Sequence, residues 1–278
     1  MVKLFHDASE NCSRVVTEKY STSFSSAIRM LHRDLRTPIF NIYGFVRFAD
    51  EIVDSFHGYD KHTLLAEFKN ETWEAIARGI SLNPILNSFQ RTVNEYNIDH
   101  ALIEAFFHSM EMDLSQTRYD SEGYKEYIYG SAEVVGLMCL YVFCDGKKEM
   151  YDKLEAPARS LGAAFQKVNF LRDFNADFNG LSRVYFPGCD FSNFTRCDKE
   201  KIEADIQLDF DQAYEGILRL PMKSRFGVYV AYKYYLSLFR KIKQLQPATV
   251  LQQRVRIPNY RKALIILRAS VKNQLRLI

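Results

Sequence analysis

The sequence predicts an all-α protein with a single domain over residues 1–278, and three observations support this. Apolar side chains recur every three or four residues through almost the whole chain, which is typical of helices. No segment alternates apolar and polar residues in the manner of a half-buried strand. No stretch rich in Pro, Gly or Ser divides the chain in two. The composition, 47% apolar and 26% charged, is that of a soluble globular protein.

The helices are expected in order along the chain. The first covers residues 13–32, and Pro38 opens the second, because proline fits a first helical turn. Segment 122–144 contains Gly130 and Gly136, which favour a kink or a close helix contact. A later helix starts near Pro157 and runs through Asp177, followed by a loop over 178–198. The remaining helices are expected at 60–79, 84–97, 99–117, 199–219, 222–245 and 258–276.

Residues 166–177 carry the strongest functional signal. Four polar residues lie at offsets 0, 3, 7 and 11, so they share one side of a helix: Gln166, Asn169, Asp173 and Asp177. The residues between them are apolar, which predicts a mostly buried helix. Buried carboxylates are unfavourable unless they are paired or bound to a cation. The pattern therefore predicts ligands for a metal ion or a diphosphate.

Residues 40–56 repeat this pattern. Tyr43, Arg47, Asp50 and Asp54 lie at offsets 0, 4, 7 and 11 among apolar residues. Two such carboxylate pairs on two helices can face each other across a cavity, and Mg²⁺ commonly bridges carboxylates to substrate phosphates. We therefore expect Mg²⁺, with Mn²⁺ as an alternative. The structural alternative is a buried ion-pair network that includes Arg47 and Arg172.

Charge and motifs exclude several other functions. The net charge of +3 and the absence of a recognition motif argue against nucleic acid as a partner. The five cysteines form no Cys-x-x-Cys pair, and no His-x-x-x-His or nucleotide-phosphate loop is present. An odd cysteine count and an N-terminus without a signal-peptide core predict a cytoplasmic protein.

The C-terminal part is basic. After Glu215 the chain has no acidic residue and 14 Lys and Arg residues. This pattern fits a solvated face, contact with diphosphates, or peripheral contact with an anionic membrane, here the inner membrane surface. The helix at 258–276 is amphipathic, and both membrane contact and core packing explain it equally well.

Taken in order, the motifs resemble those of the squalene and phytoene synthase family, over about residues 18–265. The motifs are Ser21-Thr-Ser23-Phe24, Tyr43 to Asp54, Tyr127 to Gly136, Gln166 to Asp177, Arg183-Val-Tyr185-Phe, and, with looser alignment, Tyr235 and Arg254. The resemblance implies an isoprenoid-synthase helical bundle with a central cavity, and two prenyl diphosphates as substrates.

The resemblance also implies roles for these residues. Asp50, Asp54, Asp173 and Asp177 would hold the metal. Substrate would be bound by Ser21, Ser23, Phe24, Arg47, Gln166, Asn169, Arg183, Tyr235 and Arg254. Tyr43, Tyr127 and Tyr185 would stabilise carbocations or take a proton.

The implied reaction joins two geranylgeranyl diphosphates to phytoene through a cyclopropyl diphosphate, without NADPH, as in bacterial carotenoid biosynthesis. Formation of squalene or dehydrosqualene from farnesyl diphosphate is the close alternative. More remote alternatives are a terpene cyclase and a non-catalytic scaffold. Four positions depart from the family pattern. Glu51 stands where a second Asp is frequent and keeps a carboxylate, and Tyr20 stands where some members have His. Glu133 stands where a small Gly is usual, which bears on the kink, and Ala176 replaces a frequent Glu.

Overall fold

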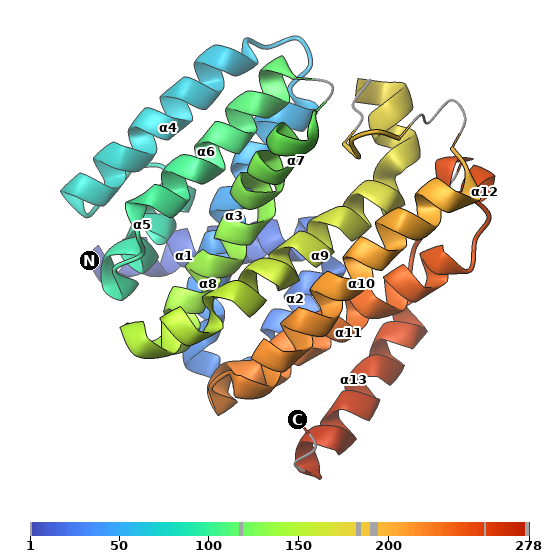
Figure 1. The fold of residues 1–278 in the computed structure, drawn as a ribbon. Helices are drawn as coiled ribbons and strands as arrows, with labels where there is room; N and C mark the ends of the chain where they lie inside the picture. Colours follow the sequence, from blue (N-terminus) through green and yellow to red (C-terminus); the bar gives the residue numbers. More distant parts are fainter. Residues whose placement is uncertain (1, 117–118, 182–184, 190–193, 253, 276–277) are drawn as a thin grey trace.

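The computed structural model describes residues 2–116, 119–181, 185–189, 194–252, 254–275 and 278, and of residues 175–181 it describes the backbone only. Within these residues every regular element is a helix, which confirms the predicted fold class (Figure 1). The helices are α1 (Val2–Tyr20), α2 (Thr22–Ile28), α3 (Arg33–Ser55), α4 (Lys61–Arg78), α5 (Pro84–Tyr96), α6 (His100–Ser115), α7 (Ser121–Ile128), the π-helical turn η1 (Tyr129–Glu133), α8 (Val134–Cys144), α9 (Lys148–Leu181), α10 (Arg196–Arg219), α11 (Met222–Lys243), α12 (Pro247–Gln252) and α13 (Asn259–Gln274).

The N-terminal expectation was wrong in two respects. Instead of one helix over 13–32, α1 begins at Val2 and ends at Tyr20, and α2 begins at Thr22. Ser21 separates them because its backbone is extended, and its side chain accepts a hydrogen bond from the Phe24 amide. This break turns Phe24 towards the centre of the molecule.

Proline positions were also misjudged. Pro38 and Pro157 lie inside α3 and α9 rather than opening them. Helix α3 begins earlier because the His32 amide donates to the Lys223 carbonyl at 2.9 Å and Arg36 Nε donates to the Leu31 carbonyl at 2.9 Å, so the chain is already ordered before the proline. The local sequence pattern that suggested a helix start at proline contains no information about such tertiary contacts.

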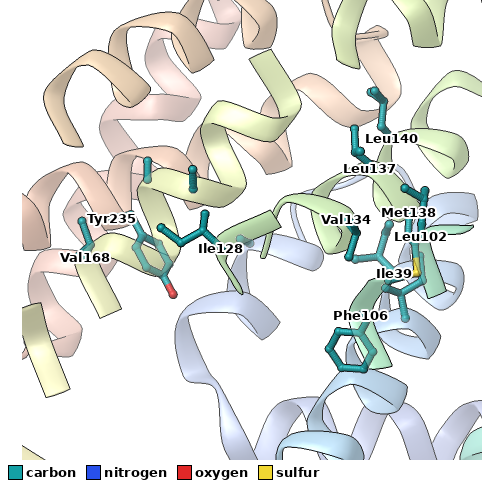
Figure 2. Packing of buried hydrophobic residues seen from close by; sticks show 14 of the residues in the cluster. Ile39, Leu102, Phe106, Ile128, Val134, Leu137, Met138, Leu140, Val168 and Tyr235 are labelled. Carbon is teal, nitrogen blue, oxygen red and sulfur yellow. The ribbon is translucent and has the colours of Figure 1, made fainter. Parts of the chain in front are cut away.

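Helix α9 is central in the second half of the bundle and packs against α8, α10 and α11. In the first half, α1 packs against α3 and α5. Figure 2 shows Val134 and Met138 of α8 close to Leu102 of α6 and Ile39 of α3, so α8 connects the two halves. Val134 and Met138 are fully buried.

The segment Ser121–Cys144 is, by length and composition alone, apolar enough to cross a membrane. Half of its most apolar window is buried inside the bundle, so its apolar character has a sufficient explanation as a core segment.

A π-helical turn interrupts this segment at Tyr129–Glu133, where the two glycines predicted a kink or a close contact. Gly130 allows a close approach to α6, since a Cβ there would lie 2.5 Å from the Ala105 carbonyl oxygen. Across the turn, a Cβ on Gly162 of α9 would lie 2.6 Å from the Ala132 carbonyl oxygen. The close approach of α6 therefore depends on the missing side chain of Gly130, and the close approach of α9 on that of Gly162.

Candidate active site

A cavity of about 910 Å³ lies at the centre of the bundle. Its apolar lining includes Ile39, Ile42, Val46, Leu140, Phe143, Leu154, Pro157, Leu161, Ile217 and Leu220. Its polar lining includes Ser21, Arg47, Asp50, Asp54, Asp113, Gln166, Asn169, Arg172, Asp173 and Arg254. On both α3 and α9, the apolar lining residues lie nearer the N-terminal end of the helix and the charged ones nearer its C-terminal end. The cavity therefore has a polar end and an apolar end.

The first carboxylate pair lies on α3. Burial, the charge of Asp54 and the charge of Asp113 raise the pKa of Asp50 to about 7. Arg47 opposes this effect, with its Nη1 3.8 Å from Asp50 Oδ2, and it also pairs with Glu51. The Arg47 guanidinium stacks over the Tyr20 ring, 4.4 Å from its centroid. Within the described residues Arg47 Nε is buried without a hydrogen-bond partner, so this group is a donor suited to an anionic ligand.

The second carboxylate site lies on α9. Arg172 Nη2 lies 2.5 Å from one oxygen of Asp173, and Arg254 Nε lies 2.7 Å from the other. One turn earlier, Asn169 Oδ1 accepts a hydrogen bond from Tyr235 Oη at 3.3 Å. A buried ion-pair network was the sequence-based alternative to a metal site. Ion pairs of Arg47 and Arg172 are present, and they involve the predicted ligands Asp50 and Asp173 themselves.

Four aromatic rings on the cavity wall are in mutual contact. Phe24 contacts the rings of Tyr43, Phe165 and Tyr235 at centroid distances of 5.5, 6.0 and 5.6 Å, and Phe165 stacks on Tyr235 at 3.9 Å. Figure 2 shows Tyr235 on the side of Val168 of α9, away from the Val134 group. Burial, and secondarily Tyr235, raise the pKa of Tyr43 to about 12, so its hydroxyl keeps its proton at neutral pH.

A third carboxylate, Asp113 of α6, was missed by the sequence analysis. It accepts a hydrogen bond from Tyr127 Oη at 2.9 Å, and it is buried. Its signal was available, because Phe106, Met110 and Asp113 lie at helical spacing on the buried side of α6. A carboxylate on a core stripe is as unusual there as in the two recognised motifs.

A second group of aromatic rings includes Tyr127, the partner of Asp113. Tyr185 stacks on Phe170 at a centroid distance of 3.9 Å and an interplanar angle of 8°. Tyr127 lies 5.5 Å from Tyr185 and 4.9 Å from Tyr119. Each predicted catalytic tyrosine thus lines the cavity with neighbouring rings.

The structure brings together most of the residues predicted for the site. Those on the cavity wall are Ser21, Phe24, Tyr43, Arg47, Asp50, Asp54, Tyr127, Gln166, Asn169, Asp173, Tyr185, Tyr235 and Arg254. Ser23 is not on the described wall; in the first turn of α2 its backbone carbonyl accepts a hydrogen bond from Ser26 Oγ at 3.0 Å. Arg183 lies outside the described residues, and so does the side chain of Asp177, whose backbone belongs to α9.

The departure at Glu133 leaves the π-helical turn intact. Arg159 Nε donates to Glu133 Oε2 at 2.6 Å, and the Arg159 guanidinium lies over the Tyr129 ring at 5.1 Å. Glu133 is absent from the described cavity wall, so its longer side chain does not shorten the cavity.

The fold and the site together define an all-α protein whose central cavity is charged at one end and apolar at the other. The family model described as squalene/phytoene synthase matches residues 17–207. The chain belongs to the squalene/phytoene synthase family and is a prenyltransferase of this type. The family carries out head-to-head condensation of prenyl diphosphates.

Relatives and solved structures agree with this assignment. The phytoene synthase of Arthrospira platensis is 27% identical over 293 residues, covering 96% of this chain and 93% of that protein. The presqualene diphosphate synthase of Rhodopseudomonas palustris is 31% identical over 168 residues, covering 60% of this chain and 58% of that protein. A ligand complex of a dehydrosqualene synthase superposes with a TM-score of 0.82 at 18% identity, covering 98% of each chain. This likeness confirms the isoprenoid-synthase fold.

Proposed function

We propose that this protein joins two geranylgeranyl diphosphates head to head and forms phytoene through a cyclopropyl diphosphate. The observation that carries the proposal is the division of the 910 Å³ cavity into a charged end and an apolar end. The phytoene synthase relative, aligned over 96% of this chain, supports the choice of product.

The length of the apolar wall supports the substrate choice. From Asp50 to Ile39 the α3 wall measures about 17 Å, and from Asp173 to Pro157 the α9 wall measures about 24 Å, at the usual helical rise. An extended chain advances about 1.2 Å per bond, so the sixteen-carbon main chain of a geranylgeranyl group reaches about 18 Å. Such a chain is shorter than the α9 wall and about as long as the α3 wall, so it can lie along α9 with its diphosphate at the charged end.

The charged end suits Mg²⁺, with Mn²⁺ as the alternative. Burial in the first place, and then the charges of Asp54 and Asp113, raise the pKa of Asp50, and a divalent cation would offset the repulsion between these carboxylates. Among the described residues no group of three or more His, Cys, Asp or Glu side chains could hold a metal ion by itself. We therefore infer that Asp50, Asp54 and Asp173 share the cation with the diphosphate, as is usual for Mg²⁺.

When bound, Mg²⁺ would stabilise the negative charge of the leaving diphosphate. Arg47, Arg172 and Arg254 would bind its oxygens through their guanidinium groups. The rings of Phe24, Phe165 and Tyr235 would face the allylic cation and exclude water from it. Phytoene forms when the last cation loses a proton, and Tyr127, held by Asp113, is oriented to take part in that proton transfer.

The proposal is tested by incubating the purified protein with geranylgeranyl or farnesyl diphosphate and identifying the extracted hydrocarbon. Each incubation is run with Mg²⁺ or excess chelator, and with or without NADPH. Formation of phytoene from the C20 substrate, with Mg²⁺ and without NADPH, is the expected result. A C30 product would instead assign farnesyl diphosphate, with NADPH dependence separating squalene from dehydrosqualene. A cyclic product would favour a cyclase.

Matched variants separate catalysis from folding. Asp54→Asn and Asp173→Asn are expected to abolish turnover while the helical circular-dichroism signal persists. Glu67→Gln, an exposed carboxylate on α4, is the control and keeps full activity. Full activity in either aspartate variant would contradict the assignment, and so would product formation in excess chelator.

A further inference from the structure

Helix α13 has large apolar side chains on the side that faces away from the protein. Its exposed large apolar residues are spaced by four, three, four and four positions, so they form a single row. Their exposed fractions are 70% for Tyr260, 43% for Leu264, 62% for Leu267, 48% for Val271 and 64% for Leu275. We call this row the α13 stripe. The helix lies at the periphery of the bundle beside α11 (Figure 1).

The opposite side of α13 already satisfies the need for core packing. Ala269 is buried, and Ile265 and Ile266 pack against the hydrophobic core. The helix therefore has one apolar side that is covered and one that is not. Core packing explains only the first of these.

A row of positive charge borders the α13 stripe. Arg261, Arg268 and Lys272 are exposed and lie about 60 to 100° around the helix from the centre of the stripe, at 100° per residue. None of the three forms an ion pair within the part of the chain that the structure describes. The excess of cations also reaches α11, where burial and then the charges of Lys272 and Arg240 lower the pKa of Lys233.

We infer that the α13 stripe seats the protein on an anionic lipid bilayer. The stripe would lie at the boundary between headgroups and acyl chains, and the basic row would contact headgroup phosphates. Charge complementarity favours this occupant over a second copy of the chain. Two copies of α13 would bring like charges together, since no acidic residue follows Glu215.

The position of α13 relative to the cavity agrees with this surface. Lys262 Nζ donates to Thr22 Oγ1 of α2 at 2.7 Å, and α2 carries Phe24 of the cavity wall. Just before α13, Arg254 contacts Asp173 at the charged end. A bilayer against α13 would therefore lie beside the elements that enclose the cavity. The inference itself does not depend on which prenyl diphosphate is used.

The experiment is flotation of the full chain with vesicles of phosphatidylcholine alone or mixed with phosphatidylglycerol. The wild-type protein is expected to float only with anionic vesicles, and less so at high salt. Leu267→Ser/Val271→Ser is expected to abolish flotation. Arg261→Gln/Arg268→Gln/Lys272→Gln is expected to weaken binding about a hundredfold, at about 1 kcal/mol for each basic residue.

Two control variants match these changes elsewhere on the surface. Leu82→Ser/Leu208→Ser removes two exposed leucines, which are 92% and 56% exposed. Lys3→Gln/Arg14→Gln/Arg78→Gln removes the same charge from exposed positions on α1 and α4. Both controls should float like the wild type.

A second measurement does not rely on loss of binding. Leu267→Trp should be quenched by vesicles of brominated lipid, whereas Leu208→Trp should not. Failure of the wild-type protein to bind anionic vesicles would overturn the inference, as would equal losses in the α13 variants and their controls. A third contradicting result would be a dimer in light scattering that the α13 variants abolish, together with no binding of the wild-type protein to vesicles.

Discussion

Arg254 Nε lies 2.7 Å from Asp173 Oδ1 and connects the segment between α12 and α13 to the ligand-bearing part of α9. Arg172 lies 2.5 Å from the other oxygen of the same carboxylate. Asp173 is thus held by two cations before any ligand arrives. A diphosphate bound through a metal at Asp173, as proposed, would also meet both guanidinium groups, so the carboxylate holds two donors in place for an anion.

Replacement of Arg254 should therefore weaken substrate binding more than folding. Arg254→Gln is expected to raise KM for the prenyl diphosphate by about tenfold to a hundredfold, the usual effect of losing one charged hydrogen bond. Its side chain is 53% exposed, so the free energy of unfolding should change by less than about 1 kcal/mol. Steady-state kinetics and thermal denaturation measure the two effects. Arg256→Gln, exposed two residues further on, should match the wild type.

The raised pKa of Asp50 predicts a pH-dependent stability in the metal-free protein. Its carboxyl binds a proton more tightly when folded, with a pKa of about 7, than when unfolded, with a pKa of about 4. The unfolding temperature should therefore rise as the pH falls from about 8 to about 6. Asp50→Asn should flatten this dependence, because the amide does not titrate. An unchanged slope in this variant would contradict the assigned pKa.

Tyr127 and Tyr124 form a matched pair for testing the hydroxyl that contacts Asp113. Tyr127→Phe is expected to reduce turnover about a hundredfold, since a positioned proton donor or acceptor contributes at least that much. Tyr124 Oη is buried without a hydrogen-bond partner among the described residues, so Tyr124→Phe should keep activity and add about 1 kcal/mol of stability. Equal activity of the two variants would remove Tyr127 from the reaction.

The close approach at Gly162 should make a small substitution damaging. In Gly162→Ala the new Cβ would lie 2.6 Å from the Ala132 carbonyl oxygen and 3.0 Å from the Glu133 Cα, and neither backbone atom can move freely. We expect a loss of about 1 to 3 kcal/mol in the free energy of unfolding, measured by denaturant titration. Gly123→Ala is the control, because its nearest neighbour is the end of the Asp120 side chain at 3.3 Å.

Lys167 should be required for the contact between α9 and α10. Its Nζ lies 2.5 Å from Asp205 Oδ2 and 2.7 Å from Asp209 Oδ2. Burial is the main cause that raises the pKa of Asp209 to about 6. Lys167→Met should lower the free energy of unfolding by about 3 kcal/mol near pH 8 and by less near pH 5, where Asp209 can be protonated. Lys167→Met/Asp209→Leu should recover most of the loss; no recovery would show that the charge is not the cause.

The sequence predicted the helical class and the two polar stripes because both follow from local periodicity. Asp50 and Asp173 lie on the cavity wall as their spacing required. Helix ends were less predictable, because they depend on contacts between distant segments, such as the bond from His32 to Lys223 that allows α3 to start before Pro38. The short helix α12, which packs against α9, was also missed.

The missed and misplaced site residues have physical causes as well. Asp113 stands alone on its helix, so no repeated motif drew attention to it, although its position on a core stripe was visible. Ser23 shares a motif with Ser21, but only Ser21, which caps α2, lies on the described cavity wall. The outcome for Ser23 could not be read from spacing alone, because it depends on how α1 meets α2.

The π-helical turn at Tyr129–Glu133 changes the phase of the helix that contains it. One extra residue in a turn rotates everything after it by about 100° relative to a continuous α-helix. With this rotation, Tyr127 before the turn and Gly136, Cys139 and Phe143 after it all line the same cavity. Deletion of a single residue here would turn the second group away from the first. The length of cavity available to an apolar chain therefore depends on the register of this helix as well as on the size of the residues that line the apolar end.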